Sequence, residues 1–263
     1  MTPAAAPPSA VAPMGRMLAA QVRAGLLAYR RMPAFLVLSF GLPLMFFVLF
    51  GLPNVGHSLP DGTSLGSFVL ASLGAYAVGN VLFYNVGIGI ANQRGRKQDL
   101  LQRATPLPSA VVVASNVVSG LVLAAVSLTM LFAVAFAGGV HLPPLKWLEL
   151  GAILLVGCLP ILGLGLSLGY GASVSAAPGL ASIIFLPMAF ASGLFIPIRQ
   201  LPSLVQKVSP FLPLYHYGQL GWNVVGGADE SFGIAVLWTI GWSIVLLGLA
   251  ARAYTRDQNR KFN

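Results

Sequence analysis

Charged residues are scarce in this sequence of 263 residues. Asp, Glu, Lys and Arg together make up 8% of it, whereas hydrophobic residues make up 57%. A soluble domain carries about 25% charged residues. The shortage of charge and the presence of several apolar runs of roughly 18 residues or more indicate that lipid surrounds most of the chain. We therefore expect one polytopic membrane domain rather than a set of soluble domains.

Cysteine and the motifs of nucleotide chemistry are also rare or missing. The single cysteine, Cys158, lies in an apolar run, where we expect a small buried residue. It forms no intramolecular disulfide, and a lone cysteine makes no Cys-rich metal site. A phosphate-binding P-loop needs Gly-Lys followed by Ser or Thr, and no lysine here follows a glycine. We therefore expect no ATPase site, metal or cofactor in this chain.

Ionisable residues are nearly absent from the apolar runs. Carriers driven by an ion gradient usually hold such residues at membrane depth, so their scarcity argues against an ion-coupled secondary carrier. The net charge is +9, but the basic residues lie between apolar runs and at the chain ends. We interpret them as signals of membrane topology, and we expect no nucleic-acid partner, because no soluble basic domain is present to bind one.

The apolar runs predict an all-α membrane protein. Residues 1–13 are rich in Ala and Pro, which is typical of a disordered tail. Residues 14–31 predict an amphipathic helix, and residues 32–263 predict the transmembrane domain. Gly165 and Gly169 form a GxxxG step, for which packing within one subunit is favoured over a contact between subunits. Six spans are expected, at 33–52, 66–91, 109–137, 148–171, 179–196 and 232–252.

Segment 14–31 has a basic face and an apolar face. Arg16, Arg23 and Arg30 recur every seven residues, and apolar residues fall on the opposite side of a helical wheel. These apolar residues are Leu18, Val22, Leu26 and Tyr29. A basic amphipathic helix before the first span is expected to lie on the inner membrane surface. A charged lead-in without that role is the alternative.

The basic residues also predict the orientation. In a six-span arrangement, twelve of the fifteen Lys and Arg residues fall on one side. They are Arg16, Arg23, Arg30, Arg31, Arg94, Arg96, Lys97, Arg103, Arg252, Arg256, Arg260 and Lys261. Cytoplasmic loops carry the excess of Lys and Arg, so we expect both termini in the cytoplasm and the protein in the inner membrane of a bacterial cell.

Residues 197–230 are apolar but rich in proline. Pro202, Pro210 and Pro213 divide them into pieces too short to cross a core of about 30 Å. A seventh span would also place the basic C-terminal segment outside. We therefore expect an outer re-entrant hairpin of two short helices between spans five and six, with its backbone covered by protein or facing a wet cavity.

Polar residues in the second span follow one face. Tyr76, Asn80 and Tyr84 are spaced four residues apart, so they lie on the same side of a helix. They either line a passage for an amphipathic substrate or form hydrogen bonds to a neighbouring helix. The sequence leaves both interpretations open.

Two stretches resemble the type-2 ABC exporter permease family, which includes drug-resistance and lipid-linked glycan exporters. The first, residues 92–108, ends in Ala104-Thr105-Pro106-Leu107-Pro108. The second contains Ser192-Gly193-Leu194-Phe195-Ile196-Pro197, then Leu201-Pro202 and Pro213-Leu214-Tyr215-His216. The order and spacing of these motifs, with the six-span arrangement, extend the resemblance over nearly the whole chain.

The resemblance implies roles for both stretches. The first is expected to dock on a separate nucleotide-binding ATPase subunit, which would bind ATP and Mg²⁺, through Arg94, Arg96, Lys97, Asp99, Leu101, Arg103, Thr105 and Pro106. The second is expected to form the outer gate, through Ser192, Gly193, Phe195, Pro197, Pro202, Pro213, Leu214 and His216. The chain would be half of a homo- or heterodimeric pathway that exports an amphipathic, drug-like or lipid-like substrate. A non-transporting membrane scaffold is the alternative.

Overall fold

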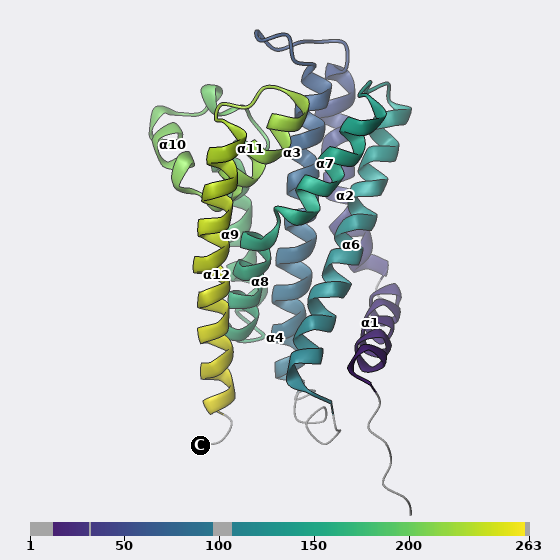
Figure 1. Ribbon diagram of the computed structural model, residues 1–263, viewed down its shortest axis with the longest axis vertical. Helices are drawn as coiled ribbons and strands as arrows, with labels where there is room; N and C mark the ends of the chain where they lie inside the picture. Colours follow the sequence, from purple (N-terminus) through teal and green to yellow (C-terminus); the bar gives the residue numbers. More distant parts are fainter. Residues whose placement is uncertain (1–12, 32, 97–106, 261–263) are drawn as a thin grey trace, which may run out of the picture.

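The computed structural model describes residues 13–31, 33–96 and 107–260. All regular structure in these residues is helical; they contain one isolated bridge, between Ser58 and Ser64, and no strand. Long helices run side by side along the longest axis (Figure 1). The prediction of an all-α membrane protein is confirmed.

The helices are, in chain order, α1 (Met14–Arg30), α2 (Pro33–Phe46), η1 (Phe47–Gly51), η2 (Leu52–Asn54), α3 (Leu65–Asn80), η3 (Val81–Val86), α4 (Gly87–Gly95), α6 (Ser109–Ala137), α7 (Pro144–Val156), α8 (Leu159–Gly171), α9 (Ala177–Ala191), η4 (Ile198–Gln200), α10 (Ser203–Val208), η5 (Ser209–Phe211), α11 (Pro213–Val225) and α12 (Phe232–Arg260).

Among the described residues, four helical segments are long and apolar enough to cross a membrane. They are Leu65–Gly95, Ala110–Ala137, Pro144–Gly171 and Phe232–Gln258. Two further apolar helices, Ser39–Asn54 and Ala177–Ala191, are shorter. The second, third, fourth and sixth predicted spans are therefore found as long helices, and the first and fifth as shorter ones.

Several helix ends lie four or more residues from the predicted span boundaries; α9, for example, ends at Ala191 rather than 196. The fourth span begins at Pro144 rather than 148, and it bends between α7 and α8. Pro160 lies in the first turn of α8, and a proline inside a continuous helix would clash with the carbonyl four residues earlier. The sixth span was predicted to end at 252, but α12 continues as a helix to Arg260.

The segment Leu65–Gly95 lies at the centre of the bundle, and 89% of its most apolar 18-residue window is buried. It packs closely on α8 because glycines leave room for the backbone. A Cβ atom at Gly169 would lie 2.9 Å from the carbonyl oxygen of Gly87, and one at Gly165 would lie 3.2 Å from that of Leu82. The GxxxG step is therefore used for packing within the chain, as predicted.

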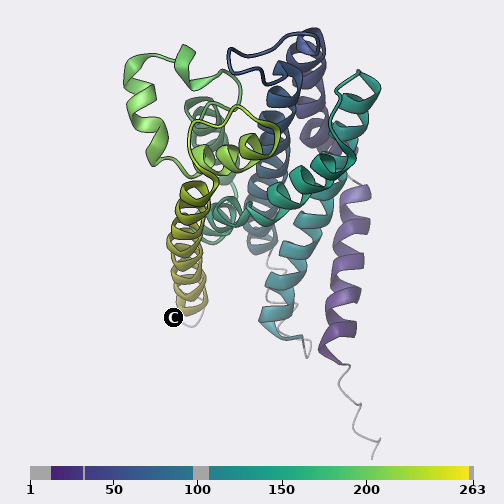
Figure 2. The ribbon, with the colours of Figure 1, turned by 45° about the horizontal axis from the view of Figure 1, so that its top comes forward.

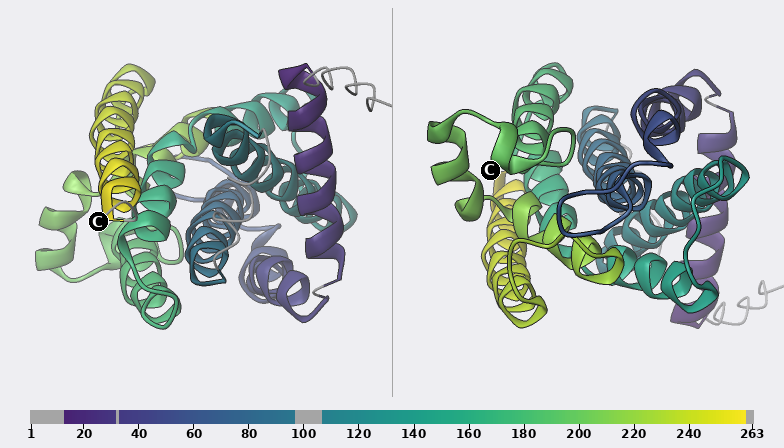
Figure 3. Two further views of the ribbon diagram at one scale, coloured as in Figure 1. Left: turned by 90° about the horizontal axis from the view of Figure 1, so that it is seen from below. Right: turned by 90° about the horizontal axis from the view of Figure 1, so that it is seen from above.

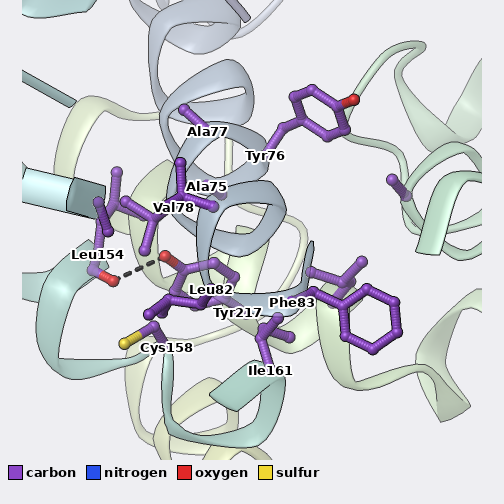
Figure 4. Packing of buried hydrophobic residues seen from close by; sticks show 14 of the residues in the cluster. Ala75, Tyr76, Ala77, Val78, Leu82, Phe83, Leu154, Cys158, Ile161 and Tyr217 are labelled. Atoms are coloured by element: carbon purple, nitrogen blue, oxygen red, sulfur yellow. Dashed lines mark hydrogen bonds between the residues drawn. The ribbon is translucent and has the colours of Figure 1, made fainter. Parts of the chain in front are cut away.

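The core around this contact is apolar. Cys158 is fully buried beside Ile161 and Leu82, which confirms its expected role as a small core residue. Figure 4 also shows the hydroxyl group of Tyr217 donating a hydrogen bond to the backbone oxygen of Leu154 at 2.7 Å. This bond satisfies the polar end of a fully buried side chain.

Two membrane-depth helices contain π-helical turns, at η1 and η3. A π-turn adds one residue to a helical turn and is often found at functional sites. Because η3 follows Asn80 directly, the regular spacing predicted to place Tyr76, Asn80 and Tyr84 on one face is interrupted after Asn80.

The described arginines of α1, α4 and α12 lie at one end of the bundle, which we call the basic end (Figure 1). Helix α1 lies crosswise to the long helices at this end (Figure 3). Its arginines are exposed, and Leu18, Val22, Leu26 and Tyr29 are half-buried. The predicted two-faced helix is therefore present, and its apolar face turns towards α6 and α2.

Candidate functional site

The predicted gate lies at the end opposite the basic end, where short helices follow α9 (Figure 2). Gly193 has a φ of +82°, which is strained for other residues. Pro197 and Pro202 precede η4 and α10, and Pro213 begins α11. Proline is favoured at a helix start because its missing N–H would be unpaired there. The prolines thus start short helices as well as separating them.

Helix α11 is covered by protein along nearly its whole length. Its 13 residues span about 20 Å at 1.5 Å per residue, less than a bilayer core. Leu214 is fully buried, and Trp222 stacks on Phe68 with ring centres 5.1 Å apart. The indole N–H of Trp222 donates to the hydroxyl of Ser72 at 2.8 Å. Irregular backbone is tolerated at membrane depth only where protein covers it or water reaches it, and here protein covers it.

Polar side chains of α11 hold the turn that precedes α12. The side-chain oxygen of Gln219 accepts a hydrogen bond from the backbone N–H of Asp229 at 2.9 Å, and Asn223 donates to the carbonyl of Glu230 at 3.1 Å. His216 lies 2.8 Å from a carboxylate oxygen of Glu230. The gate segment and the start of α12 are therefore joined as one unit.

The imidazole of His216 has a defined hydrogen-bonding arrangement. It is 1% exposed and stacks on Trp238 at 4.9 Å. Its Nε2 atom lies 2.7 Å from the carbonyl oxygen of Pro210. A carbonyl oxygen only accepts, so Nε2 is the donor in this hydrogen bond, and Nδ1 faces the carboxylate of Glu230.

An aromatic cluster connects the predicted gate to the polar face of the second span. Its members are Phe46, Tyr76, Phe83, Tyr84, Phe185, Phe190 and Phe195. The ring centre of Phe195 lies 4.8 Å from that of Tyr76, and Phe185 lies 5.8 Å from both Tyr76 and Tyr84. Two sets of residues that are far apart in sequence thus meet in space.

The polar residues of the second span divide between two surroundings. Tyr76 is 3% exposed inside the aromatic cluster, and Asn80 donates a hydrogen bond to the carbonyl of Ser39 in α2 at 3.2 Å. Asn80 therefore bonds a neighbouring helix, one of the two roles left open. Tyr84 lies further along, at the wall of a separate cavity near α1.

A small cavity of about 200 Å³ lies next to the gate. Phe195, Gly193 and Pro197 form one side of it, and residues of α3 such as Ser72 and Phe68 form the other. Ser192, in the same turn, is fully buried, and its hydroxyl has no hydrogen-bond partner in the described part of the chain. The turn after α9 therefore contains a buried hydroxyl group without a partner among the described residues, as α11 contains the side-chain nitrogen of Gln219.

At the basic end, Arg94 forms a clamp between three helices. Its guanidinium donates two hydrogen bonds to one carboxylate oxygen of Asp257 in α12, at 2.9 and 2.6 Å. It donates two more to the carbonyl oxygens of Gly169 and Ala172 at the end of α8, at 2.8 and 2.9 Å. The side chains of Arg94 and Asp257 are 23% and 7% exposed.

The rest of the predicted coupling set is largely outside the described residues. Lys97, Asp99, Leu101, Arg103, Thr105 and Pro106 fall there. Arg96 is described and exposed at the basic end, whereas the guanidinium of Arg94 is turned into the bundle. Sequence reasoning did not identify Asp257 or Glu230 as partners. No local pattern indicates that Arg94 pairs with Asp257, 163 residues away, or that His216 pairs with Glu230, 14 residues away.

These features define an all-helical integral membrane protein with a proline-rich segment at one end and a basic end opposite. The chain belongs to the ABC-2 type transporter family, which matches residues 17–221. That match runs from α1 to α11. The protein is therefore an ABC-2 type permease, a kind of subunit that is generally not catalytic and that typically works with an ATPase partner.

A curated relative is also similar over most of its length. It carries the name "Putative transport permease YvfS" and comes from Bacillus subtilis (strain 168). The two chains are 26% identical over 199 residues, which are 75% of this chain and 81% of the relative.

Proposed function

We propose that this chain is the membrane subunit of an ATP-driven ABC exporter and forms half of a dimeric translocation pathway. The observation that carries the proposal is the continuity of one buried helix. The segment Leu65–Gly95 contributes Tyr76 to the aromatic cluster beside the gate and Arg94 to the contacts at the basic end. A push on the connection that follows Arg94 is therefore applied directly to the helix that contacts the gate.

The topology that goes with this function has six spans and both termini in the cytoplasm. The helical segment from Pro33 to Asn54 has 22 residues, about 33 Å at 1.5 Å per residue, enough for the core of a bilayer. Helix α9 has 15 residues and crosses where the bilayer thins around the short helices beside it. In this arrangement α10 and α11 form the outer re-entrant hairpin.

Force then passes from the ATPase to the gate in two steps. ATP, bound with Mg²⁺ by the partner, brings two ATPase subunits together, and their motion displaces residues 92–108 and α1. Because Arg94 holds α8 and α12 as well as α4, these helices move with it. Since Glu230 before α12 is bonded to His216, the motion reaches the gate segment. An amphipathic, drug-like or lipid-like substrate leaves between the two permease subunits.

The coupling role is tested by replacing Leu101 and Arg103 with Ala. We expect the double variant to lose co-purification with the cognate ATPase and substrate-stimulated ATP hydrolysis. Arg252→Ala, an exposed cation at the basic end, is the matched control and should behave as wild type. Normal assembly and hydrolysis in the Leu101/Arg103 variant would remove the coupling role and favour a non-transporting scaffold.

The gate role is tested by Phe195→Ala, which removes the ring that contacts Tyr76 and Phe46. We expect changed export with normal assembly and a normal amount of protein in the membrane. Phe211→Ala, at a ring that is 65% exposed, serves as the control. Equal export in both variants would contradict a gate at this position.

A further inference from the structure

The imidazole of His216 in α11 contacts two oxygen atoms that belong to neighbouring elements. Its Nε2 atom lies 2.7 Å from the carbonyl oxygen of Pro210 in η5, and its Nδ1 atom lies 2.8 Å from a carboxylate oxygen of Glu230, before α12. A neutral imidazole has one N–H group and one lone pair, whereas an imidazolium has two N–H groups. A neutral ring therefore cannot donate to both oxygens.

The contact between Nδ1 and Glu230 needs a proton of its own, because the N–H group at Nε2 is used by Pro210. A bare nitrogen lone pair and an ionised carboxylate repel each other, so a proton lies between them, on either the nitrogen or the oxygen. The distance of 2.8 Å is the usual length of a charge-assisted hydrogen bond. The loss of this proton is a property of the pair rather than of either residue.

The pair is buried, so water does not replace the proton while the two side chains stay together. The side chain of His216 is 1% exposed and that of Glu230 is 13% exposed. Trp238 of α12 covers one face of the imidazole, with ring centres 4.9 Å apart and planes 6° from parallel. A buried ionised group without a partner is costly. Once the proton is lost, the carboxylate of Glu230 is therefore favoured in water, which is within reach because the next residue, Asp229, is exposed.

The other charged groups around α11 have partners elsewhere in the described part of the chain. The elements α3, α8, α9 and η5, which pack on α11, contain no Asp, Glu, Lys, Arg or His, and those of α12 lie at the basic end. Lys146 and Glu149 of α7 pair with each other at 3.0 Å, and Arg199 of η4 pairs with Asp229 at 2.8 Å. On α11 itself, the phenol ring of Tyr215 lies 5.0 Å from the imidazole. The imidazole and the carboxylate of Glu230 therefore set the charge of this joint.

We propose that the pair of His216 and Glu230 is a proton-operated latch between the gate segment and α12. The latch is closed while one proton lies between Nδ1 and the carboxylate. As the pH rises, this proton passes to water, the imidazole keeps its N–H bond to Pro210, and the carboxylate of Glu230 turns out to solvent. The turn before α12 then keeps only the neutral hydrogen bonds made by Gln219 and Asn223.

The latch opens only as the pH rises. At acid pH a third proton neutralises the carboxylate of Glu230, but the carbonyl oxygen of the acid still accepts a hydrogen bond from Nδ1–H. The contact is then weaker, because it has lost one charge, but it is kept. The stability that the latch contributes is therefore present at low pH and lost at high pH.

The latch is measured in the purified full-length chain, in detergent micelles, between about pH 5.5 and about pH 9, a range that includes the usual charge change of histidine. Hydrogen exchange of residues 226–236 is followed by mass spectrometry and expressed relative to the intrinsic rate at each pH. This stretch contains the amides of Asp229 and Ala235, which are hydrogen-bonded. We expect its protection to fall about tenfold as the pH rises, the effect of one hydrogen bond to a charged group. The ¹⁵N signal of Nδ1 in His216 should change over the same range.

Glu230→Gln tests the proton directly. Its neutral amide donates to the Nδ1 lone pair while Nε2–H donates to Pro210, so the contact persists without a proton that titrates. Protection of residues 226–236 should then be constant with pH. Asp229→Asn, which removes the neighbouring acid paired with Arg199, and His57→Gln, at an exposed histidine, are the matched controls and should keep the wild-type dependence.

Three results would each overturn the proposal. They are constant protection in the wild type, an unchanged pH dependence in Glu230→Gln, and an equal loss of the dependence in Asp229→Asn. The measurement uses no ATPase and no substrate, so a failure of the export function leaves it unaffected. Only the effect of the latch on transport, a response of the gate to the pH outside the cell, rests on the proposed function.

Discussion

The clamp around Arg94 gives the sharpest prediction about stability. Arg94→Met removes four hydrogen bonds of a charged donor, two to Asp257 and two to carbonyls at the end of α8. Removing one partner of a buried ion pair costs about 3–5 kcal/mol. Because the guanidinium is 23% exposed, we expect the lower end, about 3 kcal/mol.

Replacing the partner residue, Asp257, should reduce the free energy of unfolding by less. In Asp257→Leu, Arg94 keeps its two carbonyl acceptors and some contact with water, so we expect a loss of about 2 kcal/mol. The double variant removes both members of this ion pair. Its destabilisation should therefore be about 2 kcal/mol smaller than the sum of the two single losses.

The free energies are measured by chemical unfolding in detergent micelles, followed by tryptophan fluorescence. Arg252→Met, at an exposed arginine of α12, is the control and should change stability little. If the two single losses simply add in the double variant, Arg94 and Asp257 do not act as a pair, and the interpretation of Arg94 as a clamp between helices is wrong.

Three further predictions concern packing, a buried hydrogen bond and a loop. Gly169→Ala should destabilise by about 1–3 kcal/mol because its Cβ would meet backbone of α4, whereas Gly171→Ala, with open space around it, should be neutral in the same unfolding assay. Tyr217→Phe should lose about 1 kcal/mol with its buried hydrogen bond, and a neutral result would contradict that bond. The hydrogen bond from the backbone N–H of Thr63 holds the pKa of Asp61 below its usual value. A lowered folded-state pKa adds stability above the unfolded-state pKa, and this stability is lost as the pH falls through the folded-state pKa. The protection of the Thr63 amide against hydrogen exchange, relative to the intrinsic rate at each pH, should therefore fall at acid pH, and Asp61→Asn should remove that dependence.

Much of the helical arrangement follows from apolar runs and prolines. Apolar stretches longer than the bilayer core predict helices without reference to distant contacts, and Pro202 and Pro213 mark where short helices begin. The glycines at 165 and 169 predict a close helix contact because only small residues permit one. These signals are local, so a single sequence is enough to recognise them.

Other features depend on residues that meet only after folding. The pairing of Arg94 with Asp257 and that of His216 with Glu230 leave no local pattern. The π-turn at η3 has no marker in its sequence, yet it interrupts the face predicted for Tyr76, Asn80 and Tyr84. The cavity near α1 arises from three elements that pack together, so no motif indicates it.

The π-turn at η3 works as a rotational offset between the two halves of the central helix. One residue in a helix corresponds to about 100° of rotation. If residues 81–86 wound as regular α-helix with no residue removed, Arg94 would turn by about 100° to a different side of the axis. The π-turn absorbs one additional amino acid in the middle of the bundle, and the registry between the gate-facing half and the half that meets α12 rests on that turn.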